Sequence, residues 1–349
     1  MGGIISIRST EPVSHFESSI QTMIATNNTR HIGISINTPI IEKLNTRFAI
    51  FSSETDGFRE NMYQNITNSD GKSELLIRNK STWFPHSLIQ IDLTLLYSQQ
   101  NNKYDVWAPD NNEMLITYSD RLGKDSQVCR SFSLRSHIRG IAGFDLLSIT
   151  SYSKNDLKHS YDGDWGNSEL WSQDPYNFDP DIEGWNYDFF DQTIRSRITG
   201  TQELRVSKSI GKQSSIIAGT YIKFLSETDD ASGYLFAGDA SKYDGNFNIN
   251  NIAGYIQYEQ PILNDFIITL NTRFENNQIK YSGESNYYGR NDTTIEFETE
   301  DALTGFRSAI QYNINGNAMM YMSISRGYKA GGINQNPYLP SNYTTYNPE

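Results

Sequence analysis

The chain lacks the residue patterns that mark disulfide-bonded, metal-binding and helical membrane proteins. Its single cysteine, Cys129, excludes an internal disulfide and a cysteine-based metal site. No stretch approaches the ~18 consecutive apolar residues that a membrane-spanning helix needs. The few histidines follow no zinc-ligand spacing, and they are His15, His31, His86, His137 and His159. We therefore expect no metal, no cofactor and no membrane helix.

Basic charge is also scarce. The chain has 29 Lys and Arg against 41 Asp and Glu, a net charge of −12. A nucleic-acid partner is not expected, because binding to phosphates requires a basic surface. No Ser/His/Asp triad, paired catalytic carboxylates or phosphate-binding loop can be recognised, so we expect no enzymatic activity.

What the chain does contain is a regular alternation of apolar and polar residues that predicts β-strands. In 88–98, one face is apolar or aromatic while Gln90 and Asp92 occupy the other face. The apolar face consists of Ile89, Ile91, Leu93, Leu95 and Tyr97. The same pattern recurs at 214–226, 265–275 and 318–325.

About thirteen strands can be placed along the chain, and their connections alternate in length. The strands are expected at 16–25, 30–38, 44–53, 73–83, 88–98, 126–138, 143–153, 200–208, 214–226, 250–259, 265–275, 301–313 and 318–326. After the first hairpin, tight turns alternate with long polar loops, which are expected at 54–72, 99–125, 154–199, 227–249 and 276–300. Short turns on one rim and long loops on the other are typical of a transmembrane β-barrel.

We therefore predict an all-β fold, an antiparallel transmembrane β-barrel with short periplasmic turns and long extracellular loops. A propeller would supply as many strands, but it would show repeated motifs, and none is found. A large soluble all-β protein remains open at this point, because each strand alone fits either arrangement. Burial of the apolar faces would indicate the soluble protein, and an outward-facing apolar belt would indicate the membrane barrel.

Three segments resemble TonB-dependent outer-membrane receptors. Residues 321–334 are similar to the family signature S-R-G-[YF]-K-A-G-G-[FI]-N, and 346–349 resembles the D-P-E that follows it. Residues 2–12 resemble the last plug strand, although Ser6 replaces the usual asparagine. Residues 56–61 match a D-G-[FY]-x-x-N motif of an early outer loop. The signature places family positions at Gly327, Tyr328, Gly331, Gly332 and Asn334.

The resemblance implies a barrel of about 22 strands around a plug. Residues 1–13 would be the C-terminal remnant of the plug domain, and 14–349 the N-terminal part of the barrel. Met1 is followed by neither a basic nor an apolar signal region. We therefore expect an incomplete barrel of about thirteen strands, in a fragment that lacks the signal peptide, the TonB box, most of the plug and the C-terminal strands.

The resemblance further implies active uptake of a scarce nutrient across the outer membrane of a Gram-negative bacterium. A ferric siderophore leads among the expected nutrients, and cobalamin or a carbohydrate is the alternative within this class. From a different class, a soluble carbohydrate-binding or structural β-protein is the alternative. The implied partners are the nutrient, outer-membrane lipid and the TonB–ExbB–ExbD complex, which would be contacted through the missing N-terminal region.

The longest predicted loop is the main candidate for ligand binding. Between Tyr161 and Gln192 there is no Lys or Arg, while carboxylates and aromatic residues alternate. Such a loop suits a cationic ligand or the faces of sugars. The alternative is a solvated loop whose aromatic residues pack on one another. The candidate ligand-binding residues are Trp165, Trp171, Tyr176, Trp185 and Tyr187.

Arg326 and Lys329 of the signature are two further candidates. They would pair with acidic loop residues or bind an anionic ligand. The alternative is a glycine-rich exit from a strand that needs only backbone freedom.

Overall fold

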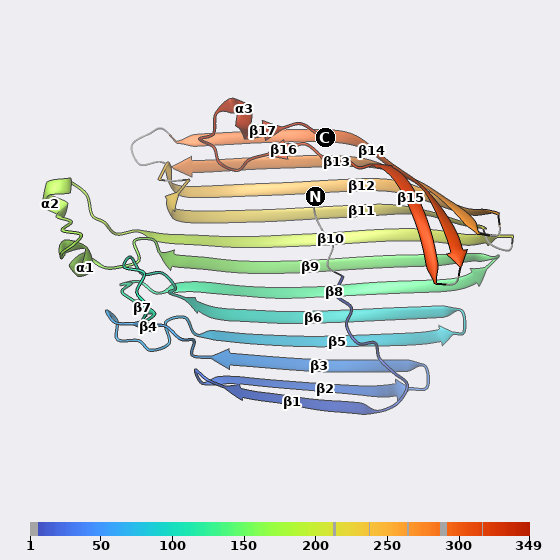
Figure 1. The fold of residues 1–349 in the computed structure, drawn as a ribbon, viewed down its shortest axis with the longest axis horizontal. Coiled ribbons are helices and arrows are strands. Elements are labelled where there is room, and N and C mark those ends of the chain that lie inside the picture. Colours follow the sequence, from blue (N-terminus) through green and yellow to red (C-terminus); the bar gives the residue numbers. More distant parts are fainter. Residues whose placement is uncertain (1–5, 212–213, 237, 264, 287–291, 316) are drawn as a thin grey trace.

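The computed structural model describes residues 6–211, 214–236, 238–263, 265–286, 292–315 and 317–349. Within these ranges, thirteen strands form one antiparallel sheet in which every strand pairs with its neighbour in the chain (Figure 1). The strands are β1 (Glu17–Ala25), β2 (Thr29–Ile41), β3 (Leu44–Thr55), β5 (Lys72–His86), β6 (Ile89–Tyr104), β8 (Gly123–Ile141), β9 (Phe144–Asp162), β10 (Phe190–Ile210), β11 (Ser214–Leu235), β12 (Ala240–Leu263), β13 (Phe266–Asn286), β14 (Thr293–Asn315) and β15 (Ala318–Arg326). Every strand predicted from the sequence is confirmed.

Short strands and helices lie in the long loops at one edge of the sheet. They are β4 (Glu60–Asn61), β7 (Ile116–Thr117), α1 (Ser168–Ser172) and α2 (Pro180–Glu183). The segment after β15 contains β16 (Gly332–Ile333), α3 (Ser341–Thr344) and β17 (Thr345–Tyr346). No helix in the described part of the chain is long and apolar enough to cross a membrane.

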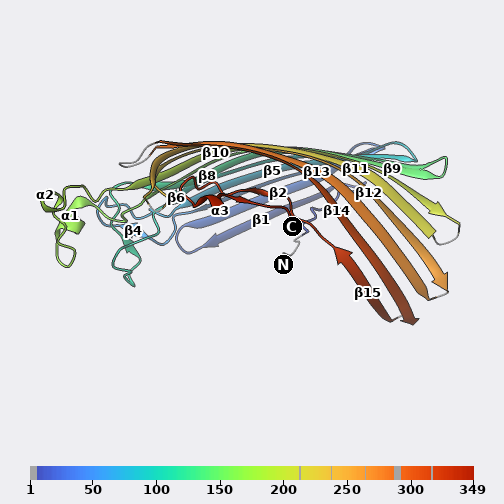
Figure 2. The same cartoon turned by 90° about the horizontal axis from the view of Figure 1, so that it is seen from above.

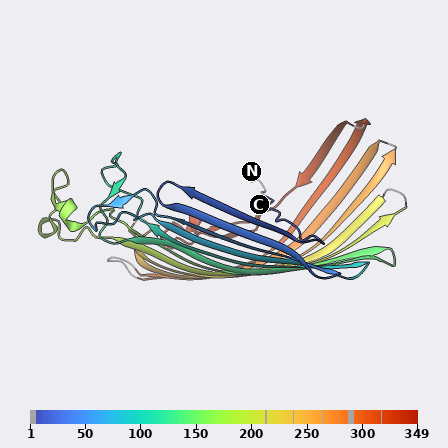
Figure 3. The ribbon, with the colours of Figure 1, turned by 90° about the horizontal axis from the view of Figure 1, so that it is seen from below.

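The sheet is strongly curved but does not close. Figure 2 shows it as a trough, and Figure 3 shows its two outermost strands, β1 and β15, standing apart. The segment that follows β15 lies on the concave side, which we call the inner face. The fold is thus part of a barrel wall with two open edges, as the resemblance implies.

The outer face carries the apolar side chains. Leu95, Ile256 and Met322 are 44%, 43% and 73% exposed, whereas Asp92 on the inner face is only 8% exposed. Ile89, Ile91 and Leu93 are likewise partly exposed rather than buried. This is the outward belt expected of a membrane barrel, so the alternative of a soluble protein with a dry apolar centre is wrong.

Three of the predicted long loops are present, and two are not. Loops follow β3, β6 and β9, whereas β11 continues to Leu235 and β12 begins at Ala240. Likewise β13 extends to Asn286 and β14 begins at Thr293, so the expected loops at 227–249 and 276–300 are mostly strand. The alternation signal was lost there because the outward residues become polar. On β12 they change from Ile252 and Ile256 to polar residues, namely Asn250, Asn248, Asn246 and Asp244.

These strands are much longer than a bilayer requires. β12 has 24 residues, against about 9–11 for one crossing. The excess residues project beyond the apolar belt. Their outward residues are polar, and on the inner face Tyr243 and Tyr281 are buried, at 4% and 3% exposed.

The segment before β1 runs along the inner face. Lys80 Nζ of β5 lies 2.6 Å from Glu11 Oε1. The Asn37 side chain accepts a hydrogen bond from the Val13 amide at 2.9 Å and donates one to the Val13 carbonyl at 2.8 Å. Residues 2–5 of the plug-like stretch lie outside the described residues. Assignment of 1–13 to a plug stays a prediction.

Candidate functional site

A cavity of about 810 Å³ opens in the loop between β9 and β10, at the rim that carries the long loops. Aromatic side chains dominate its lining, namely Tyr161, Trp165, Trp185, Tyr187, Phe189 and Tyr234. Asp188 and Asp191 contribute carboxylates, and none of the described lining residues is Lys or Arg. The lining of the cavity is therefore aromatic and acidic, and its volume suits a small-molecule ligand.

A single carboxylate organises this loop. Asp164 Oδ1 accepts hydrogen bonds from the Gly166 amide at 3.0 Å and from Trp171 Nε1 at 3.2 Å. Asp164 Oδ2 accepts one from the Phe189 amide at 2.9 Å, which ties the start of the loop to its end. Trp165, which lies between Asp164 and Gly166, adopts a left-handed backbone conformation with φ 62°. This conformation is unfavourable for a bulky residue, and it is held in place by the surrounding bonds.

The aromatic residues form two layers. The ring of Trp171 meets the rings of Tyr176 and Tyr187 at 4.5 and 4.6 Å between centroids. Trp171 and Tyr176 thus pack against aromatic residues of the same loop, and they are not among the residues that line the cavity. Trp165 and Trp185 line it and remain 39% and 47% exposed. Of the five predicted aromatic residues, the structure brings Trp165, Trp185 and Tyr187 to the cavity.

Neighbouring loops complete the site. The ring of Trp107, in the loop after β6, stacks on Trp165 at 5.9 Å. Tyr234 at the end of β11 packs edge-on against Phe189 at 5.3 Å, and its amide donates to Asp191 Oδ1 at 2.7 Å. The sequence analysis missed Trp107 and Tyr234, because they lie far from residues 163–189 in the sequence and reach this loop only in the folded sheet.

Buried carboxylates lie beneath the loop. Asp162 is 4% exposed, and neither of its carboxylate oxygens has a hydrogen-bond partner of regular geometry. Burial, reinforced by the nearby Asp164 and Asp120, raises the pKa of Asp162 to about 7. Burial likewise raises the pKa of Asp120. No group of three metal-ligating side chains capable of holding an ion occurs among the residues that the structure describes.

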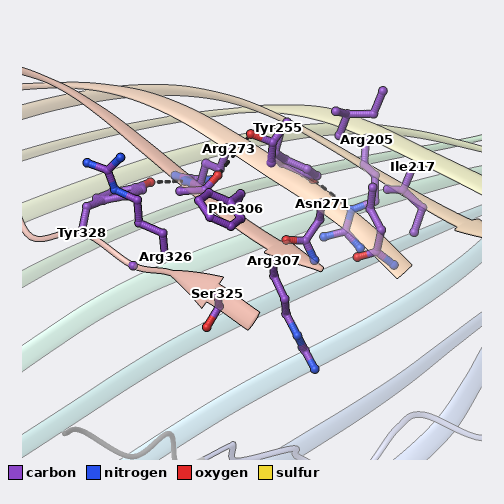
Figure 4. A pocket seen from close by; sticks show the side chains of 15 residues that line it. Arg205, Ile217, Tyr255, Asn271, Arg273, Phe306, Arg307, Ser325, Arg326 and Tyr328 are labelled. Atoms are coloured by element: carbon purple, nitrogen blue, oxygen red, sulfur yellow. Dashed lines mark hydrogen bonds between the residues drawn. The ribbon is translucent and has the colours of Figure 1, made fainter. Parts of the chain in front are cut away.

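A second pocket, of about 470 Å³, lies on the inner face of β10–β15 (Figure 4). Five of its residues and Gly219 follow one another across neighbouring strands in the order Arg, Gly, Tyr, Arg, Gly, Tyr, and the row consists of Arg205, Gly219, Tyr255, Arg273, Gly305 and Tyr328. The first five are in direct cross-strand register, and Tyr328 lies over Gly305 from the segment that follows β15.

Each arginine of this row is paired with a carboxylate and a tyrosine. Arg205 donates to Glu203 at 2.7 Å and to the Tyr255 hydroxyl at 3.1 Å, while Tyr255 donates to the same carboxylate. Arg273 Nε lies 2.8 Å from Glu275 and 3.0 Å from the Tyr328 hydroxyl. Tyr328 in turn donates to Glu275 at 2.9 Å. The two groups repeat one arrangement on the barrel wall.

The signature residues therefore dock the end of the chain onto the inner face. The Gly331 amide donates to Asp301 Oδ2 at 2.9 Å, and Gly332 belongs to β16, which pairs with β17. The Asn334 side chain donates to the Tyr343 carbonyl within the same segment. Gly327 lines the pocket at the point where the chain leaves β15. For these residues the structure shows a packing role.

The two predicted cations are separated from the loop cavity. Arg326 ends β15, pairs with Phe306 and is among the residues that line the pocket of about 470 Å³. Lys329 Nζ lies over the Tyr346 ring at 4.7 Å. Their binding roles stay predictions.

Comparison with known proteins is informative only at the level of structure. Neither a protein-family model nor a curated protein matches the sequence. The ferric yersiniabactin uptake receptor FyuA from Yersinia pestis superposes with a TM-score of 0.78 at 13% identity, covering 97% of this chain and 51% of that chain. The chain has the fold of such receptors. The fold that the sequence resemblance implies is thereby confirmed.

Two further receptors have a similar fold. The ferric-catecholate import receptor Fiu from E. coli K12, in its open form, gives a TM-score of 0.67 at 13% identity, with 91% of this chain and 55% of that chain covered. The siderophore receptor PiuA from Acinetobacter baumannii gives 0.69 at 11% identity, with 97% and 53% covered. The chain thus spans about half the length of the receptors that it matches.

Proposed function

We propose that the chain is part of a TonB-dependent receptor that takes up a scarce nutrient across the outer membrane of a Gram-negative bacterium. Residues 1–13 would end the plug, and 14–349 would form the first part of the barrel. Energy would come from the TonB–ExbB–ExbD complex, acting through a region outside this chain. The protein acts as a receptor and transporter, with no catalytic step of its own.

The observation that carries this proposal is the two-faced, curved sheet. Its outer face is an apolar belt, its inner face is polar, and its strands follow one another without a break in chain order. Such a wall is stable where hydrocarbon lies outside it and water or a polar domain lies inside it. The long loops at one rim then face the medium from which the nutrient is captured.

A ferric siderophore is the proposed nutrient. The three receptors described above are named for the uptake of ferric or siderophore ligands. Cobalamin or a carbohydrate, taken up by the same type of receptor, is the second candidate. The aromatic lining of the loop cavity favours this alternative as well, because flat rings stack on both aromatic groups and sugar faces.

Deletion of the whole gene tests the proposal. Under iron limitation, the deletion strain should fail to grow on one ferric siderophore that supports the parent strain, and the plasmid-borne gene should restore growth. Disruption of the TonB system should abolish the restored growth. Unchanged use of every ferric chelate, with loss of growth on a sugar or on cobalamin, would replace the siderophore by that nutrient. No growth difference on any of them would overturn the receptor proposal.

A further inference from the structure

We infer that the loop cavity selects a ligand that carries a flat ring and has no net negative charge. The inference rests on the proposed function and narrows its nutrient to uncharged or cationic compounds. The site is the cavity of about 810 Å³ between β9 and β10. Two features of its wall, the exposed rings and the absence of basic residues from its described lining, carry the argument.

The rings are held ready for contact. Trp165 and Trp185 line the cavity while 39% and 47% exposed, and Tyr234 is 51% exposed. Asp164 accepts hydrogen bonds from the Gly166 and Phe189 amides, and these bonds hold Trp165 in its left-handed conformation. Trp107 stacks on the ring of Trp165 at 5.9 Å between centroids. Exposed indole rings on a rigid support present flat apolar faces, which attract aromatic rings, sugar faces and cations.

The charge of the surroundings is negative. Asp188 and Asp191 line the cavity, and the carboxylate of Asp164, which is 4% exposed, accepts a hydrogen bond from the amide of the lining residue Phe189. The guanidinium of Arg121 is already engaged by Asp188, by Asp120 at 3.7 Å and by the Phe190 ring at 5.0 Å. No basic side chain belongs to the described lining of the cavity. The field at the mouth therefore repels anionic chelates and attracts cations.

Dye binding to the purified whole receptor tests this directly. The cationic planar dye proflavine should bind at least about tenfold more tightly than the anionic planar dye pyrenesulfonate at low salt, and added salt should reduce the difference. Trp165→Ala and Trp185→Ala should each weaken proflavine binding by about tenfold. Phe58→Ala is the matched control, because Phe58 is an aromatic residue, 58% exposed, in the loop after β3, outside the cavity.

A charge inserted into the lining gives a second, independent readout. Asn186 is an exposed lining residue, so Asn186→Lys should leave the loop folded and reverse the preference towards pyrenesulfonate. Equal binding of the two dyes, or equal losses in Phe58→Ala and the tryptophan variants, would overturn the inference.

Ferric complexes connect the cavity to uptake. The neutral complex ferric tris(8-hydroxyquinolinate), which carries flat rings, should displace proflavine, and an anionic ferric tris-catecholate should not. Displacement by the catecholate alone would overturn the inference without affecting the receptor proposal. That proposal fails separately, in the growth experiment, because dye binding requires neither transport nor TonB.

Discussion

At the scale of single residues, the buried carboxylate of Asp162 makes the loop sensitive to pH. Its pKa of about 7 in the folded protein lies above its usual value of 3.8. The unfolded chain therefore loses this proton at lower pH than the folded chain does. The protonated Asp162 side chain therefore stabilises the folded state fully below about pH 4, and this contribution is lost as the pH rises through about 7.

We accordingly expect the loop to be more stable at pH 5 than at pH 8, as measured by hydrogen exchange of residues 163–189 at both pH values. Asp162→Asn should remove most of this difference and stabilise the loop at pH 8. Asp181→Asn, an exposed carboxylate of α2, serves as the control. A difference that persists in Asp162→Asn would assign the effect to another group.

A glycine decides whether Tyr328 can dock. A Cβ at Gly305 would lie 2.8 Å from Cε1 of the Tyr328 ring, whereas a Cβ at Gly254 would meet nothing within 4 Å. Gly305→Ala should therefore displace Tyr328 from Arg273 and Glu275 and raise the hydrogen exchange of 327–349. Gly254→Ala should leave that exchange unchanged. Equal protection in both variants would show that the segment is held without Tyr328.

At the scale of secondary-structure elements, each long strand contains a part inside the belt and a part beyond it. Ile256 and Asn246 both face outward on β12, the first within the apolar belt and the second beyond it. Ile256→Lys should cost about 2–4 kcal/mol of unfolding free energy in lipid, and Asn246→Lys about 0–1 kcal/mol. Urea titration of the whole receptor in vesicles measures both. Similar costs would place the belt elsewhere on the strand.

The same division explains what the sequence could predict. Apolar alternation such as that of Ile89, Ile91 and Leu93 located all thirteen strands of the sheet. It could not reveal the projecting halves of β11–β14, where outward residues such as Asn248 and Lys280 are as polar as those of a loop. Strand existence follows from one-sided burial, but strand length beyond the membrane does not.

The sequence could predict the residues of the loop cavity only where they lie close together in the chain. The tryptophans of 163–189 stand out because no basic residue separates them, and three of the five predicted aromatic residues line the cavity. The Arg–Gly–Tyr row was missed, because Arg205, Tyr255 and Tyr328 become neighbours only through strand register and chain return. Single-sequence patterns do not contain that register.

At the scale of the whole molecule, the sheet offers two free edges. β1 and β15 are the outermost strands, and each pairs with one neighbour only. The outward residues of β15 are strongly exposed, with Met320, Met322 and Ile324 at 64%, 73% and 67%. An edge of this kind leaves backbone N–H and C=O groups unpaired, and hydrocarbon cannot hydrogen-bond to them.

Residues 1–349 produced alone should consequently fail to form a stable barrel in vesicles, whereas the longer receptor proposed above should fold. Electrophoresis without boiling checks this, because a closed barrel resists detergent and migrates as a compact species. Each unsatisfied backbone group costs several kcal/mol in hydrocarbon, so a row of them outweighs the gain from burying the belt. A compact, protease-resistant form of 1–349 as a monomer would mean that β1 and β15 can pair directly. The same form as an oligomer would mean that edges of different copies pair.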